Sequence, residues 1–174
     1  MNGNKTYFLY NSSGSCAELD ETGNELRSYG YAPGSVVPLF LRKNGDYYFY
    51  LNDHLGAPQK IISGSGRVVW SAVYEAYGKA TVTVEEVVNN FRLPGQYADP
   101  ETGLHYNFFR YYDTETGRYI NVDPARDGLN FYAYCKADPL NFTDPYGLCA
   151  VRNALDSLGD ALSIAGDTAL GALN

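Results

Sequence analysis

Short runs of aromatic and aliphatic residues alternate with clusters of Gly, Asn, Asp and Ser over most of the chain. This pattern predicts short β-strands joined by hairpin turns, in which Gly or Asn supplies a positive φ. Residues 32–45 contain Pro33, Gly34 and Pro38 and are predicted to form a longer link. The strands that we predict lie at residues 6–10, 16–19, 25–31, 46–51, 59–62 and 67–74.

Two internal repeats support the hairpin interpretation. Residues 18–23 align weakly with residues 61–66, which lie 43 residues later. The segment 97–103 (Y-A-D-P-E-T-G) matches 111–117 (Y-Y-D-T-E-T-G) at a spacing of 14. Each copy reads as the end of a strand followed by a turn that closes on Gly. Such hairpins bury little apolar surface alone, so we expect them to stack on their neighbours.

The C-terminal residues follow a helical pattern, and we predict one helix from Val151 to about Leu173. One face of this helix would carry an apolar stripe: Val151, Leu155, Leu158, Leu162, Ala165, Ala169 and Ala172. The opposite face is acidic, so we expect the helix to cover apolar protein surface rather than an anionic membrane. The predicted fold class is therefore all-β: a curved open sheet of short antiparallel hairpins with one C-terminal α-helix. The first strand, at 6–10, would be an unpaired edge.

Composition narrows the classes of function. The chain has 174 residues, of which 17 are Tyr and 18 Gly, and this favours one domain of many short strands. A net charge of -7 argues against binding nucleic acid through its phosphates. Cys16, Cys135 and Cys149 form no C-x-x-C motif, and His54 and His105 are isolated. We therefore predict no metal site, no cofactor and reduced thiols.

The same sequence bears on location. The first residues contain no apolar run, so we predict no signal peptide. No stretch approaches the roughly 20 apolar residues of a membrane span, so no insertion into a membrane is expected. The expected location is therefore cytoplasmic, and the oligomeric state is left open.

Candidate chemistry lies between residues 118 and 148, where three Asp-Pro steps occur. Asp144-Pro145-Tyr146-Gly147 fits a type I turn, which would place the Asp144 carboxylate near the Leu148–Cys149 peptide bond. Asp123-Pro124 opens a second turn that could return to the first. Two carboxylates beside one peptide bond can share a proton, so that one activates water and the other polarises the carbonyl. The alternative is that each Asp-Pro pair only ends a strand.

A long series of residues in this region resembles the C-terminal core of the RHS/YD-repeat family, which includes polymorphic toxins and toxin-complex C subunits. The resemblance is strong over residues 90–148 and weaker over 5–80. It is carried by Phe91-Arg92, Gly95-Gln96-Tyr97, Asp99, Glu101-Thr102-Gly103-Leu104, Tyr106, Arg110-Tyr111-Tyr112-Asp113, Gly117-Arg118-Tyr119, Asp123-Pro124, Gly128-Leu129-Asn130, Tyr132, Tyr134 and Asp144-Pro145-Tyr146-Gly147-Leu148.

The resemblance implies that Asp123 and Asp144 cleave the chain after Leu148 and release a cargo segment into a shell of repeats. It also implies two parts: a core over residues 1–148, with repeats at 5–120 and the cleavage motif at 121–148, and a tail over 149–174. The expected partner is the rest of an RHS shell or a homologous repeat protein. The resemblance also suggests that a dedicated secretion system exports the protein, in which case it is not cytoplasmic.

Departures from the family pattern leave alternatives open. Asp138 adds a third carboxylate, and Asp127 is a second candidate for the role of Asp123. The 26-residue tail is short for a folded toxin. The chain could instead be a truncated or orphan scaffold without catalytic activity. A third hypothesis, an acyl shift onto Cys149, lacks an activating base in the sequence.

Overall fold

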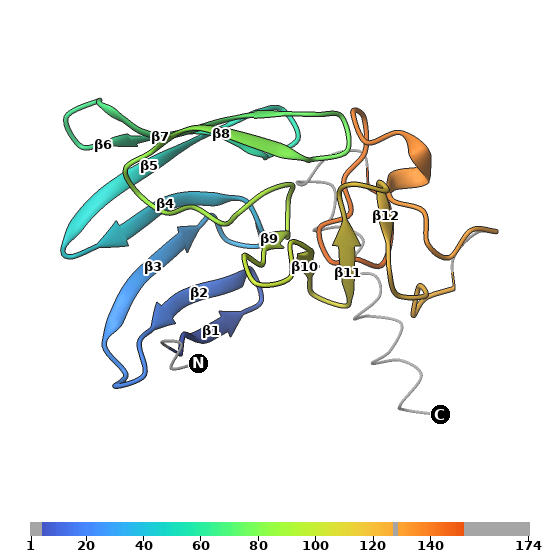
Figure 1. The fold of residues 1–174 in the computed structure, drawn as a ribbon, viewed down its shortest axis with the longest axis horizontal. Helices are drawn as coiled ribbons and strands as arrows, with labels where there is room; N and C mark the ends of the chain where they lie inside the picture. The colour runs from blue at the N-terminus through green and yellow to red at the C-terminus, as the bar shows by residue number, and fades with distance from the viewer. Residues whose placement is uncertain (1–4, 127–128, 152–174) are drawn as a thin grey trace.

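The computed structural model describes residues 5–126 and 129–151, and these residues form two antiparallel sheets (Figure 1). The first sheet has eight strands in sequence order, each paired with the next. Its strands are β1 (Tyr7–Asn11), β2 (Gly14–Leu19), β3 (Glu25–Tyr31), β4 (Pro38–Lys43), β5 (Asp46–Asn52), β6 (Pro58–Ser63), β7 (Val68–Tyr74) and β8 (Ala80–Glu85). The sheet is open and curved, with β1 at one edge and β8 at the other.

One turn recurs between these strands. At residues 20–24, 53–57, 63–67 and 75–79 the first N–H donates to the fifth carbonyl, and the fourth N–H donates to the first carbonyl. The fourth residue is Gly each time, with φ between +83° and +98°. Only Gly adopts this conformation without a steric penalty, so the spacing of Gly sets the hairpins. The turns at 20–24 and 63–67 also confirm the 43-residue repeat.

The all-β fold class and the six predicted strands are confirmed, and β1 is an edge strand as expected. The prediction of a link over residues 32–45 is wrong, because Pro38–Lys43 forms β4 between β3 and β5. Pro38 stands at the first position of the strand, where its missing N–H is tolerated. Strand β8 was not predicted, although the alternation in Thr81-Val82-Thr83-Val84 is a β pattern.

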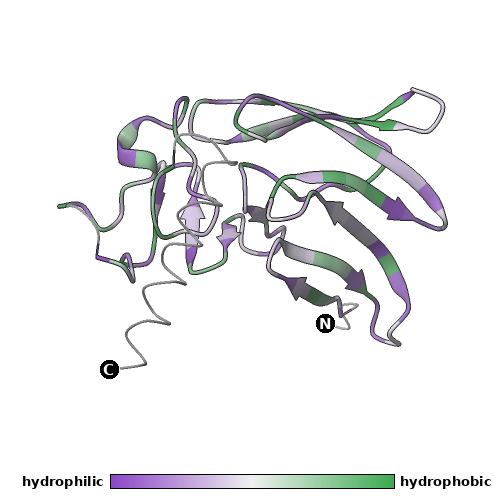
Figure 2. Ribbon diagram, turned by 180° about the vertical axis from the view of Figure 1, so that it is seen from behind, coloured by the Kyte–Doolittle hydropathy of each residue, from purple (hydrophilic) through white to green (hydrophobic). Residues whose placement is uncertain are grey.

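The core of the large sheet lies on its concave side. Phe91, in the segment that follows β8, packs edge-on against the rings of Tyr29, Tyr50 and Tyr97 at centroid distances of 4.6, 6.4 and 5.9 Å. Trp70 and the neighbouring aliphatic side chains complete this cluster. In Figure 1 the segment between β8 and β9 crosses the open side of the curved sheet, and Figure 2 shows hydrophobic stretches along the strands behind it.

A second sheet of four short strands follows. It consists of β9 (Tyr97–Ala98), β10 (His105–Asn107), β11 (Arg110–Asp113) and β12 (Arg118–Tyr119). The 14-residue repeat is confirmed, because Asp99 and Asp113 each cap their own turn by accepting the N–H two residues on and the Thr hydroxyl three residues on. The predicted single sheet is therefore continued by a separate one.

The segment after β12 packs its buried rings against this second sheet. Tyr112, Tyr119 and Tyr134 form the centre of a second core, beside Cys135. A short 3₁₀ turn, Cys135–Ala137, is the helical element of the described residues. The helix predicted from Val151 to about Leu173 lies outside the described residues, apart from Val151 itself.

Candidate functional site

The turn at Asp144–Gly147 forms as predicted. The Gly147 N–H lies 3.4 Å from the Asp144 carbonyl oxygen, and Gly147 has a φ of +70°. Pro145 is buried beneath Gly95, which has no side chain and so lets the two backbones approach closely. The turn therefore approaches the backbone at Gly95 closely on one side and the backbone of Asn107 and Arg110 on the other, where Gly147 leaves the room.

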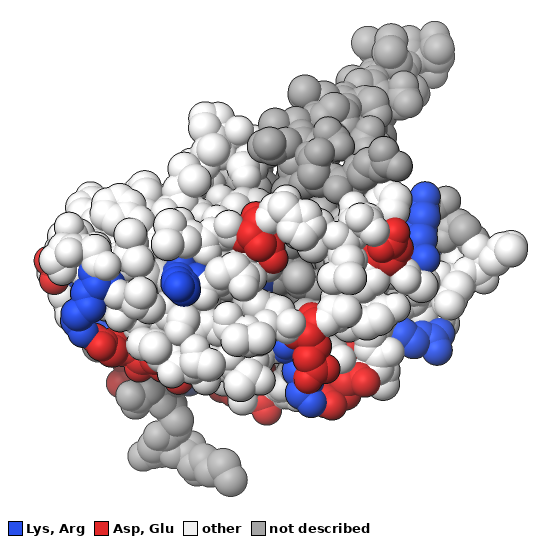
Figure 3. All heavy atoms as spheres, turned by 90° about the horizontal axis from the view of Figure 1, so that it is seen from above, with Lys and Arg blue, Asp and Glu red and all other residues white. Residues whose placement is uncertain are grey.

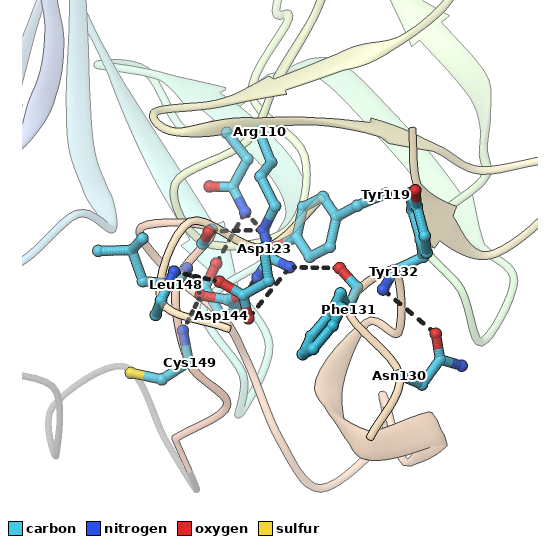
Figure 4. A network of polar contacts seen from close by, with 12 residues as sticks. Arg110, Tyr119, Asp123, Asn130, Phe131, Tyr132, Asp144, Leu148 and Cys149 are labelled. Atoms are coloured by element: carbon cyan, nitrogen blue, oxygen red, sulfur yellow. Dashed lines mark hydrogen bonds and ion pairs between the residues drawn. The ribbon is translucent and has the colours of Figure 1, made fainter. Parts of the chain in front are cut away.

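The Asp144 carboxylate, which is 2% exposed, meets the predicted peptide bond directly. Its Oδ1 accepts the backbone N–H groups of Leu148 at 2.9 Å and Cys149 at 3.1 Å, and the second of these is the amide of the Leu148–Cys149 bond. Its Oδ2 accepts the Tyr119 hydroxyl at 2.9 Å. Asp144 thus holds the bond on its nitrogen side, as Figure 4 shows.

Arg110 joins the parts of this site. Its side chain is 3% exposed and lies over the Tyr119 ring, with Cζ 3.6 Å from the ring centroid. The guanidinium donates to Asp144 Oδ2 at 2.8 Å and, through Nε, to the Gly147 carbonyl at 2.6 Å. A third contact, 3.5 Å from Nη1 to Asp123 Oδ2, brings in the other aspartate (Figure 4). One cation therefore faces both predicted catalytic carboxylates.

Asp123 is held by its own turn. Its Oδ1 accepts the Ala125 N–H at 2.8 Å, and its backbone N–H donates to the Phe131 carbonyl at 3.0 Å. The side chain is 7% exposed and approaches Asp144 through Arg110. The two Asp-Pro turns, 21 residues apart in sequence, thus reach a single guanidinium.

Both carboxylates open onto one cavity of about 500 Å³, which Leu148 and Cys149 also line. Burial raises the pKa of Asp144 above its usual range, although the Leu148 N–H, Arg110, Tyr119 and the Cys149 N–H each act to lower it. Desolvation disfavours the charged form of an acid, which explains the direction of the shift. Asp144 is thus able to hold a proton at a higher pH than an exposed aspartate.

The other aspartates and the histidines considered from the sequence do not line this cavity where the structure describes them. Asp138 is not among the lining residues of this cavity and accepts the Asn141 side-chain amide at 2.9 Å. His54 lies beside the Leu140 carbonyl, and His105 is buried next to Gln96. Asp127 lies outside the described residues. Within the described ranges, no group of three or more His, Cys, Asp or Glu side chains could hold a metal ion.

Three residues that contact Asp144 were not predicted as members of the site. Arg110, Tyr119 and Asn107 come from the tips and ends of β10–β12, and Asn107 Nδ2 donates to both the Tyr119 hydroxyl and the Asp144 carbonyl at 2.8 Å. Arg110 stands in the R-Y-Y-D stretch of the family pattern, which was the available signal. A buried Arg in a hairpin needs an acidic partner, and this rule indicates the pairing.

The fold and the site define a class: a module of β-hairpin repeats that ends in a buried carboxylate–arginine cluster around one peptide bond. The family model described as "RHS protein" matches residues 48–84. Through this segment the chain resembles the RHS family.

Two toxins are similar to this chain in sequence. Double-stranded DNA deaminase toxin A of Burkholderia cenocepacia is 42% identical over 157 residues, which cover 75% of this chain and 11% of that protein. The toxin protein Tse5 of Pseudomonas aeruginosa is 37% identical over 102 residues, covering 58% of this chain and 8% of that protein. The chain thus spans about a tenth of the length of these toxins.

Solved structures show the same fold. A chain in the Tc holotoxin pore of Photorhabdus luminescens, carrying a TccC3 mutation, superposes with a TM-score of 0.64 at 20% identity, covering 85% of this chain and 7% of that chain. The crystal structure of TcdB2–TccC3 without its hypervariable C-terminal region gives a TM-score of 0.59 at 23% identity, covering 76% of this chain and 7% of that chain.

Among the residues that the structure describes, no helix has the length and apolar content that crossing a bilayer takes.

Proposed function

We propose that this chain is an RHS core module that carries a C-terminal cargo segment of a toxin-delivery protein and frees it by cleaving itself after Leu148. One observation carries the proposal: the buried Asp144 carboxylate lies 3.1 Å from the amide nitrogen of the Leu148–Cys149 bond. Asp123 lines the same cavity on the other side of Arg110. The names of the relatives, toxins and nucleases, support a cargo of that kind.

The geometry suggests how the two aspartates divide the chemistry. Hydrolysis adds the oxygen of water to the Leu148 carbonyl carbon and leaves the Cys149 nitrogen as an amine that must gain a proton. Asp144 is already in hydrogen-bond contact with that nitrogen, and its raised pKa suits a proton donor. Asp123 is then the base that removes a proton from water. Arg110 holds the Gly147 carbonyl and Asp144 together, so the bond is positioned before reaction.

A scaffold without catalysis is the second candidate, and a specific observation favours it. Asp144 accepts four donors, from Leu148, Cys149, Tyr119 and Arg110, and such a network can serve only to fix the turn. Buried ionic networks of this kind occur as purely structural features.

Three Asp→Asn variants separate these functions. Asp123→Asn and Asp144→Asn should each abolish cleavage, because one removes the base and the other the proton donor. Asp138→Asn is the matched control, since it is also an Asp-Pro aspartate but does not line the cavity, and it should cleave like the wild type. The readout is the fraction of chain cut after Leu148, measured by mass spectrometry, with circular dichroism to verify folding. Cleavage that persists in either cavity variant would refute the assignment.

A further inference from the structure

The described chain beyond the Leu148–Cys149 bond is built into the folded unit. Thr143 and Val151 form an antiparallel bridge, in which the Thr143 N–H donates to the Val151 carbonyl at 2.8 Å and the Val151 N–H donates to the Thr143 carbonyl at 2.7 Å. Thr143 is fully buried, and Val151 is 6% exposed. Ala150 packs against the core that contains Tyr112, Tyr119 and Tyr134.

The peptide bond therefore lies between two fixed points. On its N-terminal side the Gly147 carbonyl is held by Arg110, and on its C-terminal side the bridge begins two residues after Cys149. Thr143 directly precedes Asp144, so the residue that fixes the tail is adjacent to the residue that contacts the bond. A shift of the bridge by one residue would move the Cys149 nitrogen away from the Asp144 carboxylate.

We propose that Thr143 and Val151 form an anchor for the tail side of the bond, with Val151 as a positioning residue. The anchor holds the amide of Cys149 against Asp144 in the intact chain. After a cut it keeps residues 149–151 seated on the core, so that cleavage and release of the tail are separate steps. The second half of this proposal rests on the proposed self-cleavage, whereas the first half does not.

The chemistry of the cut strengthens the anchor. Hydrolysis turns the Cys149 amide into an amine, which is protonated at neutral pH and lies beside the Asp144 carboxyl. An ammonium next to a carboxylate makes a stronger hydrogen bond than a neutral amide does. Two backbone hydrogen bonds and one buried side chain then hold the new end without any covalent link.

Amide hydrogen exchange tests the anchor whether or not the chain cuts. In the full-length protein we expect the Val151 and Thr143 amides to exchange about 100-fold or more slowly than those of an unstructured peptide, because both donate within a buried bridge. Nuclear magnetic resonance resolves the two amides individually. If the Val151 amide exchanged at the unstructured rate, the anchor would be overturned.

Three substitutions, two at Val151 and one at Val73, test whether the cleaved tail stays bound and how fast the chain cleaves itself. Val151→Asp places a charge in the buried position, Val151→Ile is the conservative replacement, and Val73→Asp is the control, because Val73 is 65% exposed. Wild type, Val151→Ile and Val73→Asp should cut at similar rates and elute from native gel filtration with the tail attached. Val151→Asp should cut at least about tenfold more slowly and lose the tail once cut. Circular dichroism of Val151→Asp shows whether the variant still folds, and a folded variant that cuts slowly and loses its tail excludes general instability as the cause.

The outcomes separate the two proposals. A wild type that cuts but loses its tail on native gel filtration would overturn the anchor and leave self-cleavage standing. A wild type that does not cut would refute self-cleavage, and slow exchange at Val151 would then support the anchor alone. Equal cleavage rates and equal retention of the tail in Val151→Asp and Val73→Asp would also overturn the anchor.

Discussion

At the scale of single residues, two glycines differ only in what surrounds them. Gly95 and Gly103 have φ values of +80° and +75°, but a Cβ on Gly95 would overlap the Pro145 carbonyl, whereas nothing lies within 4 Å of a Cβ on Gly103. Close approach at Gly95 is what seats the turn that holds Asp144.

Gly95→Ala should therefore destabilise the protein more than Gly103→Ala. Both substitutions impose the left-handed conformation on Ala, which costs about 1–2 kcal/mol. Overpacking against Pro145 should add about 1–3 kcal/mol for Gly95→Ala alone. Urea denaturation measures the difference in the free energy of unfolding. Equal losses would show that the contact with Pro145 does not constrain the turn.

The residue scale also shows what sequence could and could not predict in the site. Asp144 meets Leu148 and Cys149 because Asp, Pro and Gly at set positions of a turn determine local geometry. Arg110 is 34 residues from Asp144, and only the packing of the β10–β11 hairpin on the turn brings them together. No local rule carries that information.

At the scale of elements, Phe91 connects the segment after β8 to the concave face of the large sheet. Phe91→Ala should cost about 3–5 kcal/mol, because it removes a buried ring that contacts several tyrosines. Phe109→Ala is the control, since that ring is 60% exposed, and should change stability by less than about 0.5 kcal/mol. Thermal unfolding followed by circular dichroism compares the two. Similar melting temperatures would contradict the assigned core.

Strands could be predicted from the sequence where a turn motif marks their ends. The Gly-closed turns located the hairpins, and the repeated D-x-E-T-G turn located the ends of β9 and β11. Strand β4 was hidden because Pro38 and the preceding Pro33-Gly34 read as a link, whereas pairing on both sides determines the strand. The division into two sheets depends on long-range packing, which the strand pattern does not encode.

At the scale of the whole molecule, charge is spread rather than concentrated. On the face seen in Figure 3, acidic and basic side chains are interspersed on a mostly uncharged surface. His105 is one buried group whose ionisation makes the stability of the fold depend on pH. Burial, with a smaller effect of Arg92, lowers the pKa of His105 from 6.5 to about 3.

This shift predicts that acid weakens the fold. Between pH 6.5 and about 3 the unfolded chain binds a proton at His105 and the folded chain does not, so stability falls as the pH falls. The loss is at most about 1.4 kcal/mol per pH unit. His105→Gln should show a smaller loss than the wild type between pH 6.5 and 4 in urea denaturation. Identical pH profiles would contradict a buried neutral histidine.

The central claim is that the junction at Leu148 is a self-cleavage site, and the mass of the purified wild-type chain under denaturing conditions tests it most directly. The account predicts two fragments, residues 1–148 and residues 149–174, the second beginning with Cys149. It also predicts that the fragments separate only when the protein is denatured. A single intact mass after prolonged incubation of the folded protein would contradict the claim and leave the carboxylate–arginine cluster as architecture.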